Sequence, residues 1–252
     1  RVDWEKLEQQ LADPQTTLMI LCNPQNPAGN IWDYETLARI GALCKQYDVI
    51  VVSDEIHCDL TKPGTEYIPF ASVDDTCRDI SVTCIAPTKT FNLAGLQTAA
   101  VYAENSILHH RMWRQLNTDE VAEPNAFAIQ AAIAAFQYGE EWLDELREYV
   151  EKNKQYVTEF LQEKIPLIHP VAGDATYLMW LDCRKITESG RQFVKFIRKT
   201  SGLYVSGGNQ YGRGGEGFLR VNVATSKLVV EDGMQRLYES VDAWLKEEKI
   251  SK

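Results

Sequence analysis

The stretch VIVVSDE, residues 49–55, decides the fold class of this chain. Its first four residues form an unbroken β-branched apolar run, which is typical of a strand covered on both faces. Before it, DYETLARIGALCKQYD (33–48) has the apolar spacing of an amphipathic helix, with Asp33 as the candidate N-cap. A helix that leads into a fully buried strand indicates an α/β protein with a mostly parallel sheet.

Other short apolar runs lie on both sides of this stretch. We expect further buried strands in TTLMILCNP (16–24), DISVTCIA (79–86) and QTAAVYA (97–103). The composition then changes to an Ala-rich helix at 124–139 and a long charged helix at 140–164. The repeated order of strand, helix and strand therefore ends before the two helices begin.

This change predicts the domain organisation. We expect a large α/β domain over residues 1–122, connecting helices over 123–165 and a small α+β domain over 166–252. The elements expected in the small domain are strands at 175–183 and 217–224 and helices at 190–200 and 227–249.

Composition excludes several classes of partner. The chain has 252 residues, 44% of them hydrophobic, and a formal net charge of −10. It contains no lysine- or arginine-rich block and no apolar run long enough to span a membrane, so we expect no nucleic-acid or membrane partner. The opening residues RVDWEKLEQQ lack the apolar core of a signal peptide and begin without methionine, so we expect a fragment or a processed product of a cytoplasmic protein. None of the six cysteines is arranged as C-x-x-C, so we expect reduced thiols and neither disulfides nor a metal site.

Four polar residues follow the ends of the predicted strands. They are Asn26, Asp54, His57 and Lys89. Ligands of open α/β sheets bind at the carboxyl ends of the strands, so these side chains are candidates for one site. Each also has an ordinary interpretation, because Asn26 lies in the turn-forming stretch NPQNPAGN, Asp54 could cap a helix and a lone histidine is more often structural.

Lys89 is the most informative of the four residues. It lies in CIAPTKTFNLAGLQTAA (84–100), where its neighbours are small or apolar, rather than on an evidently solvated surface. A poorly solvated amine can act as a nucleophile and form a Schiff base with an aldehyde. Together with the carboxylate of Asp54 against a ring nitrogen, this favours pyridoxal 5′-phosphate as cofactor. Asn26 could then bond the phenolic oxygen, and the hydroxyls of Thr88 and Thr90 could meet the phosphate.

Four ordered segments carry a resemblance to a known family. They are NPQNPAGN, SDEIHCDL, APTKTFNLAGLQTA and GEGFLRVNVATSK. Their order resembles the fold-type I pyridoxal-phosphate enzymes of aminotransferase class I/II, and more narrowly the MalY/PatB group of cystathionine β-lyase-like carbon–sulfur lyases. The resemblance spans essentially the whole chain and implies the pyridoxal-phosphate-dependent transferase-like fold.

The resemblance also implies roles for matching residues. Lys89 would be the catalytic lysine that holds the cofactor aldehyde and moves the substrate proton. Asp54, Asn26, His57 and Thr88 would contact the cofactor. Arg220 in FLRVNVA would bind the substrate α-carboxylate through a bidentate fork, although a structural ion pair is the alternative, and Tyr211 would close over the site.

Three features depart from the family pattern. Ala86 replaces a serine that is often found three residues before the lysine, and Gln97 stands where many aminotransferases have a phosphate-binding arginine. The resemblance also begins late, because family members have a further third of the polypeptide upstream. We therefore expect this chain to be the C-terminal two-thirds of such an enzyme.

We consider three functions in order of preference, of which the resemblance implies the first two and the missing upstream segment motivates the third. The first is β-elimination from cystathionine or another S-substituted cysteine, giving a thiol, pyruvate and ammonia. The second is an amino-acid aminotransferase, and the third is a non-catalytic binding or regulatory module that keeps the fold. The expected partners are a small amino-acid substrate and, for the intact protein, a second copy in a homodimer.

Overall fold

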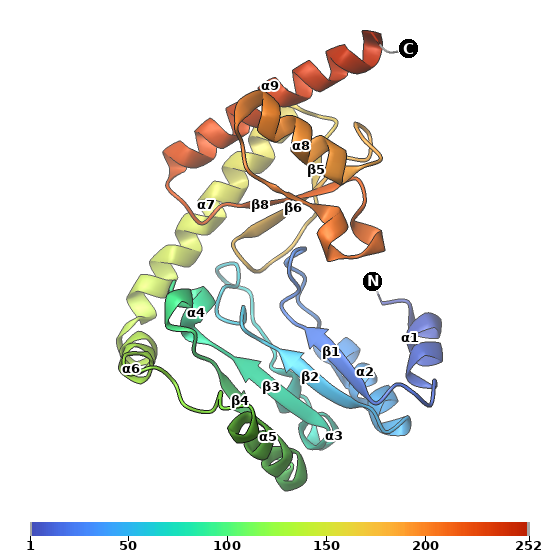
Figure 1. Ribbon diagram of the computed structural model, residues 1–252, viewed down its shortest axis with the longest axis vertical. Coiled ribbons are helices and arrows are strands. Elements are labelled where there is room, and N and C mark those ends of the chain that lie inside the picture. The colour runs from blue at the N-terminus through green and yellow to red at the C-terminus, as the bar shows by residue number, and fades with distance from the viewer. Residues whose placement is uncertain (1, 251–252) are drawn as a thin grey trace. The chain divides into compact units, whose positions relative to one another are not determined.

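The computed structural model describes residues 2–250 and the side chains of residues 2–247. The chain divides into two units (Figure 1). The first contains residues 2–25 and 31–144, and the second contains residues 26–30 and 145–250. These two units are groups of residues in mutual contact, and they do not test the domain limits expected from the sequence. Those limits stay a prediction.

The first unit is built on a four-stranded sheet. Its strands are β1 (Leu18–Cys22), β2 (Ile50–Asp54), β3 (Ser81–Ile85) and β4 (Ala100–Tyr102), in that spatial order. β1, β2 and β3 run parallel, whereas β4 runs antiparallel to β3. The mostly parallel α/β sheet expected from the sequence is therefore confirmed.

Helices cover one face of this sheet with a compact core. The core consists of buried apolar side chains from α1, α2, β2 and the segment that contains α3, such as Leu11, Ile40, Val51 and Phe70. The predicted cap of α2 is confirmed, since Asp33 Oδ1 accepts a hydrogen bond from Thr36 N at 2.7 Å. The helices of this unit are α1 (Trp4–Leu11), α2 (Tyr34–Gln46), α3 (Asp75–Asp79), α4 (Pro87–Thr90), α5 (Ser106–Thr118) and α6 (Ala128–Tyr138).

Burial of the strands differs from the sequence expectation. Leu18 and Ile20 of β1 are 50% and 68% exposed, and all three residues of β4 are exposed. β1 and β4 are the edge strands of this sheet, and the described residues cover these side chains only in part. The expectation of strands buried on both faces is therefore wrong for β1 and β4, whereas the residues of β2 are buried or half-buried in alternation.

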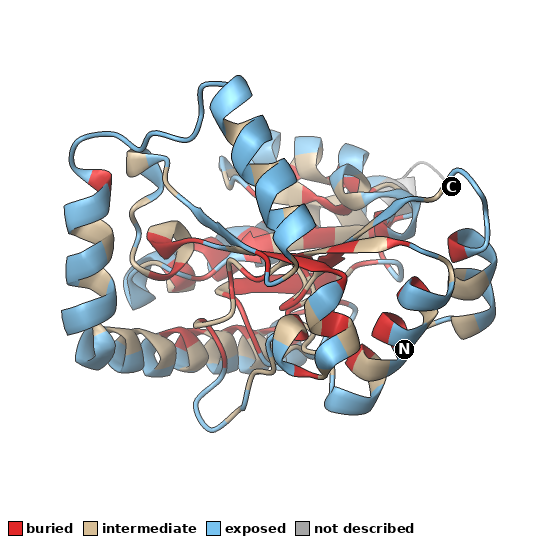
Figure 2. Ribbon diagram, turned by 90° about the horizontal axis from the view of Figure 1, so that it is seen from below, coloured by how far each residue is buried: buried red, intermediate tan, exposed pale blue. Residues whose placement is uncertain are grey.

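The second unit is an α+β structure around an antiparallel sheet. Its strands β5 (His169–Pro170), β6 (Leu178–Asp182), β7 (Ser206–Gly207) and β8 (Phe218–Asn222) lie in the order β5-β6-β8-β7. Each neighbouring pair is antiparallel. The helices are α7 (Glu140–Lys164), which begins in the first unit, α8 (Gly190–Ser201) and α9 (Lys227–Ile250). In both units the buried residues gather on the strands and on the inner sides of the helices (Figure 2).

A short early segment, residues 26–30, joins the second unit. Gly29 O accepts a hydrogen bond from Ala175 N at 3.1 Å. Gly29 has a φ of 73°, and a Cβ atom at this position would lie 2.6 Å from Ala175 O. Only glycine permits both this backbone conformation and this close approach. The segment thereby brings Asn26 into a unit formed mainly by residues more than a hundred positions later.

The described residues were also compared with what a membrane span and a metal site require. Within residues 2–250, no helix is both long enough and apolar enough to cross a bilayer. The same described part of the chain holds no group of three or more His, Cys, Asp or Glu side chains placed to bind a metal ion.

Candidate active site

Lys89 lies on a single helical turn that follows β3. The turn α4 begins with Pro87 at its first position, where the missing N–H of proline costs no helical hydrogen bond. Lys89 is half-buried on this turn. Among the described residues, its amine forms neither a hydrogen bond nor an ion pair. Without a carboxylate partner, the amine is available for chemistry.

Contacts on both sides fix the position of this turn. Thr90 is 1% exposed, and its hydroxyl donates a hydrogen bond to Asp59 Oδ2 at 3.1 Å. Phe91 packs edge-on against Phe136, with ring centroids 5.6 Å apart, and lies 5.7 Å from the ring of Trp142. The backbone of Lys89 is thus held between a partly buried hydrogen bond and an aromatic cluster. The Thr90 hydroxyl, which the sequence offered for a phosphate, is already engaged within the first unit.

Asp54 is the last residue of β2, and it is half-buried. Its Cα partner on the neighbouring parallel strand is Cys84 of β3, one of the residues that lead into α4. The carboxylate oxygen Oδ1 accepts a hydrogen bond from Ile56 N at 3.3 Å. Burial, followed by the charges of Asp54 and Glu55, raises the pKa of the Cys84 thiol. The strand ends that carry Asp54 and lead to Lys89 therefore lie side by side.

A buried acid that sequence reasoning missed supports this strand end. Glu55 is 2% exposed, and its Oε1 accepts hydrogen bonds from Ser53 Oγ at 2.8 Å and Phe70 N at 3.0 Å. Burial raises the pKa of the Glu55 carboxyl, and its hydrogen bonds only partly oppose this. The alternation of β2 places Glu55 on the core side, whereas Asp54 points to the opposite face. The sequence did carry a signal for Glu55. Side chains alternate along a strand, so one of the two adjacent acids at the end of β2 must point toward the core.

Asn23 connects the same strand end to β1. Its backbone N donates to Asp54 O at 3.1 Å, and its backbone O accepts from Tyr67 Oη at 2.7 Å. Burial and the charge of Glu55 raise the pKa of the Tyr67 hydroxyl, so it remains a neutral donor. These bonds hold the carboxyl ends of β1 and β2 together.

His57 lies in the compact turn that follows Asp54. The turn is closed by hydrogen bonds from Cys58 N to Glu55 O at 2.9 Å and from Leu60 N to His57 O at 3.0 Å. His57 is only 2% exposed. Burial is the main cause that raises the pKa of the neighbouring Cys58 thiol to about 12. His57 is therefore held in a buried part of the first unit.

The second unit brings three of the predicted residues together. Arg220 of β8 donates a hydrogen bond from Nη1 to Asn26 Oδ1 at 3.2 Å. Its guanidinium carbon lies 4.9 Å from the centroid of the Tyr211 ring, within range of a cation–π interaction. Tyr211 in turn meets the edge of Trp180, which stacks on Phe218 at 5.2 Å. Arg220 is thus positioned by an amide and an aromatic ring.

The predicted site residues fall into two groups. Asp54, His57, Thr88 and Lys89 belong to the first unit, and Asn26, Tyr211 and Arg220 belong to the second. Sequence reasoning missed Glu55, Tyr67 and Trp180, which support these residues. Assignment of the two groups to one site stays a prediction.

Comparisons with a family model and with curated proteins give results that agree with one another. Residues 1–237 match the family model described as aminotransferase class I and II. The chain is 42% identical over 236 residues to cystathionine beta-lyase PatB of Bacillus subtilis, covering 94% of this chain and 61% of that protein. It is 32% identical to protein MalY of Escherichia coli, covering 96% of this chain and 61% of MalY.

A solved structure agrees in fold. Cystalysin from Treponema denticola, whose structure contains a pyridoxal 5′-phosphate cofactor, matches with a TM-score of 0.93 at 28% identity. The match covers 96% of this chain and 62% of the cystalysin chain. The pyridoxal-phosphate-dependent transferase-like fold expected from the sequence is therefore confirmed. The chain spans about 61% of the length of the curated relatives it matches.

Proposed function

The chain belongs to the aminotransferase class I and II family, and we propose that it forms part of a pyridoxal-phosphate-dependent carbon–sulfur β-lyase. Its substrate would be cystathionine or another S-substituted cysteine, and its products a thiol, pyruvate and ammonia. The printed names of relatives such as cystathionine beta-lyase PatB support this reaction class. The observation that carries the proposal is the half-buried Lys89, without an ion-pair partner in the described part of the chain.

The donor set of the first unit fits pyridoxal phosphate. The cofactor requires an amine for its aldehyde and an acid for its ring nitrogen. Lys89 offers the amine, and Asp54 offers a carboxylate that no lysine or arginine of the described chain neutralises. Both follow carboxyl ends of neighbouring parallel strands, where α/β sheets bind ligands. When bound, the cofactor supplies an electron sink for negative charge at the substrate Cα.

The chain's own residues would bind the cofactor, move the substrate proton and bind the substrate carboxylate. Asp54 would keep the cofactor ring nitrogen protonated, and His57 and Asn26 would bond its phenolic oxygen. Thr88 would offer its hydroxyl to the phosphate. Lys89 would hold the cofactor aldehyde and remove the proton from the substrate Cα, after which the thiolate leaves from Cβ. Arg220 would bind the substrate α-carboxylate, as a planar guanidinium favours.

The second candidate is an amino-acid aminotransferase. The name of the matched family favours it, and it requires the same lysine and the same acid. The two reactions separate only after the Cα proton has been removed, because one expels the Cβ thiolate and the other returns a proton to the cofactor. We rank the lyase first because the relatives at 42% and 32% identity are PatB and MalY.

A homodimer remains our prediction for the intact protein. The exposed side of α6 supports an interaction surface, because Ile129, Ile133 and Phe136 are 54%, 43% and 53% exposed at helical spacing. Apolar side chains repeated on one side of a helix are stable when another surface covers them.

Borohydride trapping tests the assignment of Lys89. The protein is incubated with pyridoxal phosphate, reduced, digested and analysed by mass spectrometry. We expect a reduced pyridoxyl adduct on Lys89 and not on the exposed Lys62 of the same unit, and we expect Lys89→Arg to abolish it. Equal modification of Lys62 and Lys89 would show only unspecific reaction with lysines and would contradict the proposal.

A product assay separates the lyase from the aminotransferase. Cystathionine is supplied without any keto acid, and pyruvate and thiol are measured. Release of both in equal amounts supports the lyase. An absolute requirement for added 2-oxoglutarate would instead support the aminotransferase.

A further inference from the structure

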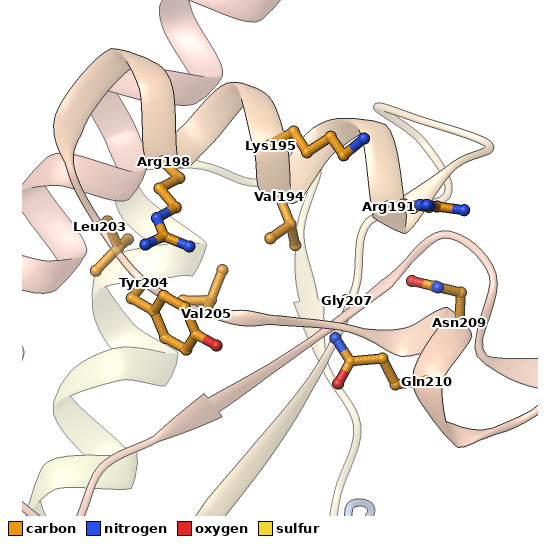
Figure 3. Close-up of a pocket in the computed structure, with 10 residues that line it drawn as sticks. All are labelled: Arg191, Val194, Lys195, Arg198, Leu203, Tyr204, Val205, Gly207, Asn209 and Gln210. Carbon is orange, nitrogen blue, oxygen red and sulfur yellow. The ribbon is translucent and has the colours of Figure 1, made fainter.

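A cavity of about 260 Å³ opens in the second unit, beside α8. One wall is α8, and the other is the segment that runs through β7 into the 3₁₀ turn Gly208–Tyr211 (Figure 3). The polar side chains that line the cavity are Arg191, Lys195, Arg198, Tyr204, Asn209 and Gln210. None of them was assigned to the proposed active site. The cavity is therefore a separate feature of the fold.

Three cations follow one another along the same side of α8. Arg191 and Lys195 are four positions apart, and Lys195 and Arg198 are three positions apart. Like charges at these spacings destabilise a helix by about 0.2–0.5 kcal/mol per pair. Within the described residues, none of the three forms an ion pair. This wall of the cavity is basic although the chain as a whole has a formal net charge of −10.

The two ends of the cavity carry different polar partners. Figure 3 shows Arg191 at the end nearest Asn209 and Arg198 at the other end, beside Tyr204. The guanidinium carbon of Arg198 lies 5.1 Å from the centroid of the Tyr204 ring. The two arginines are seven positions apart on α8, which corresponds to about 10 Å along the helix axis. The positive charges are thus spread along the cavity.

Part of the middle of the cavity is lined by apolar side chains. Val194 lies between the two arginines on α8, and Val205 comes from the opposite segment, whereas Leu203 lies at the Arg198 end (Figure 3). A ligand with charged ends and a hydrocarbon spacer would meet a guanidinium at each end and apolar side chains between them.

We propose that this cavity binds a small organic dianion, with one carboxylate at each end of a short aliphatic chain. Arginine forks bind carboxylates through paired hydrogen bonds, so Arg191 and Arg198 would each receive one end. Lys195 adds a third positive charge between them, and the side-chain amides of Asn209 and Gln210 offer neutral donors. The proposal goes beyond the β-elimination reaction, because it concerns a ligand that is neither substrate nor cofactor.

Calorimetric titration with linear dicarboxylates from succinate to suberate tests the proposal. We expect saturable binding whose affinity passes through a maximum at one chain length, and weaker binding of the monocarboxylate hexanoate. Since each arginine would contribute a charge-assisted pair of hydrogen bonds, Arg191→Gln and Arg198→Gln should each weaken binding by about tenfold or more. The matched control is Lys199→Gln, which removes the same charge from an exposed α8 residue outside the cavity and should change affinity less than about twofold.

Four results would overturn the proposal. The first is the absence of saturable binding, and the second is equal weakening by Lys199→Gln, which would reveal only long-range attraction. The third is loss of binding in Arg220→Gln, which would place the dicarboxylate at the proposed substrate arginine instead. Sedimentation of the Arg191→Gln and Arg198→Gln variants completes the test. A change in their oligomeric state would identify this face as a contact between copies and would also overturn the proposal.

Discussion

Arg220 donates a hydrogen bond to Asn26 at 3.2 Å, although the two residues are 194 positions apart in the sequence. The contact forms because residues 26–30 belong to the second unit, where Gly29 approaches Ala175. Tyr211 supplies the second contact, with its ring centroid 4.9 Å from the guanidinium carbon. The guanidinium therefore has a defined orientation before any substrate binds.

This orientation predicts the effect of replacing Arg220 by lysine. Lysine keeps the charge but lacks the planar fork, so it cannot bind the carboxylate through two parallel hydrogen bonds. We expect kcat/KM for the amino-acid substrate to fall by about 30-fold, or about 2 kcal/mol, mainly through KM. Arg213→Lys, in an exposed turn of the same unit, is the matched control. Equal kinetics of the two variants would remove Arg220 from substrate binding.

Tyr211 should act on the substrate through Arg220. Tyr211→Phe keeps the ring against both Arg220 and Trp180, whereas Tyr211→Ala removes both contacts. Cation–π contacts are worth about 0.5–1 kcal/mol at exposed sites, so Tyr211→Ala should raise KM by about two- to fivefold with little change in kcat. Tyr211→Phe should behave like the parent protein. If the phenylalanine variant were as impaired as the alanine variant, the hydroxyl and not the ring would be the important group.

The sequence predicted the helices well where a strong period and a cap coincide. The long charged helix at 140–164 and the capped helix after Asp33 lie where they were expected. The two-residue strands β5 and β7 were missed, because two residues carry no period. α5 was also missed, since SILHHRMWRQLNT mixes polar and apolar residues and its only clear signal is the capping Asn105.

The strand ends and the supporting residues differ in how far the sequence could predict them. Asp54 and Lys89 could be placed at carboxyl ends of strands, because the apolar runs fix where the strands stop. The network of Glu55, Tyr67 and Asn23 could not, since it joins residues up to 44 positions apart through backbone atoms. Burial of β1 was overestimated because an apolar run cannot show whether another element covers it.

Thr90 is expected to position the turn that carries Lys89. Thr90→Val keeps the shape but removes the hydroxyl that donates to Asp59. The loss of this partly buried hydrogen bond should lower the free energy of unfolding by about 1 kcal/mol in urea titrations. It should also lower kcat more than it raises KM, because the lysine amine would be less well placed. Thr90→Ser keeps the donor and should restore both quantities, and a failure of serine to do so would assign the effect to packing alone.

The raised pKa of the Glu55 carboxyl predicts that the stability of the folded protein depends on pH. Burial raises its pKa in the folded protein above the value of about 4.3 in an unfolded chain. The stabilising contribution of the protonated acid is therefore complete below about pH 4.3 and is lost as the pH rises through the folded-state pKa. In Glu55→Gln no proton can be released, so this loss disappears.

The measurement compares urea unfolding of the parent protein and Glu55→Gln at several pH values between about 4 and 8. At low pH, the variant is expected to be less stable by about 1 kcal/mol, because the amide satisfies the donors of Ser53 and Phe70 less well than the carboxyl group. As the pH rises, this difference should shrink or reverse, since only the parent protein must hold a buried charge. Glu123→Gln, an exposed residue of the same unit, should follow the parent curve at every pH. If the Glu55→Gln curve ran parallel to the parent curve throughout, the Glu55 carboxyl would not be the titrating group.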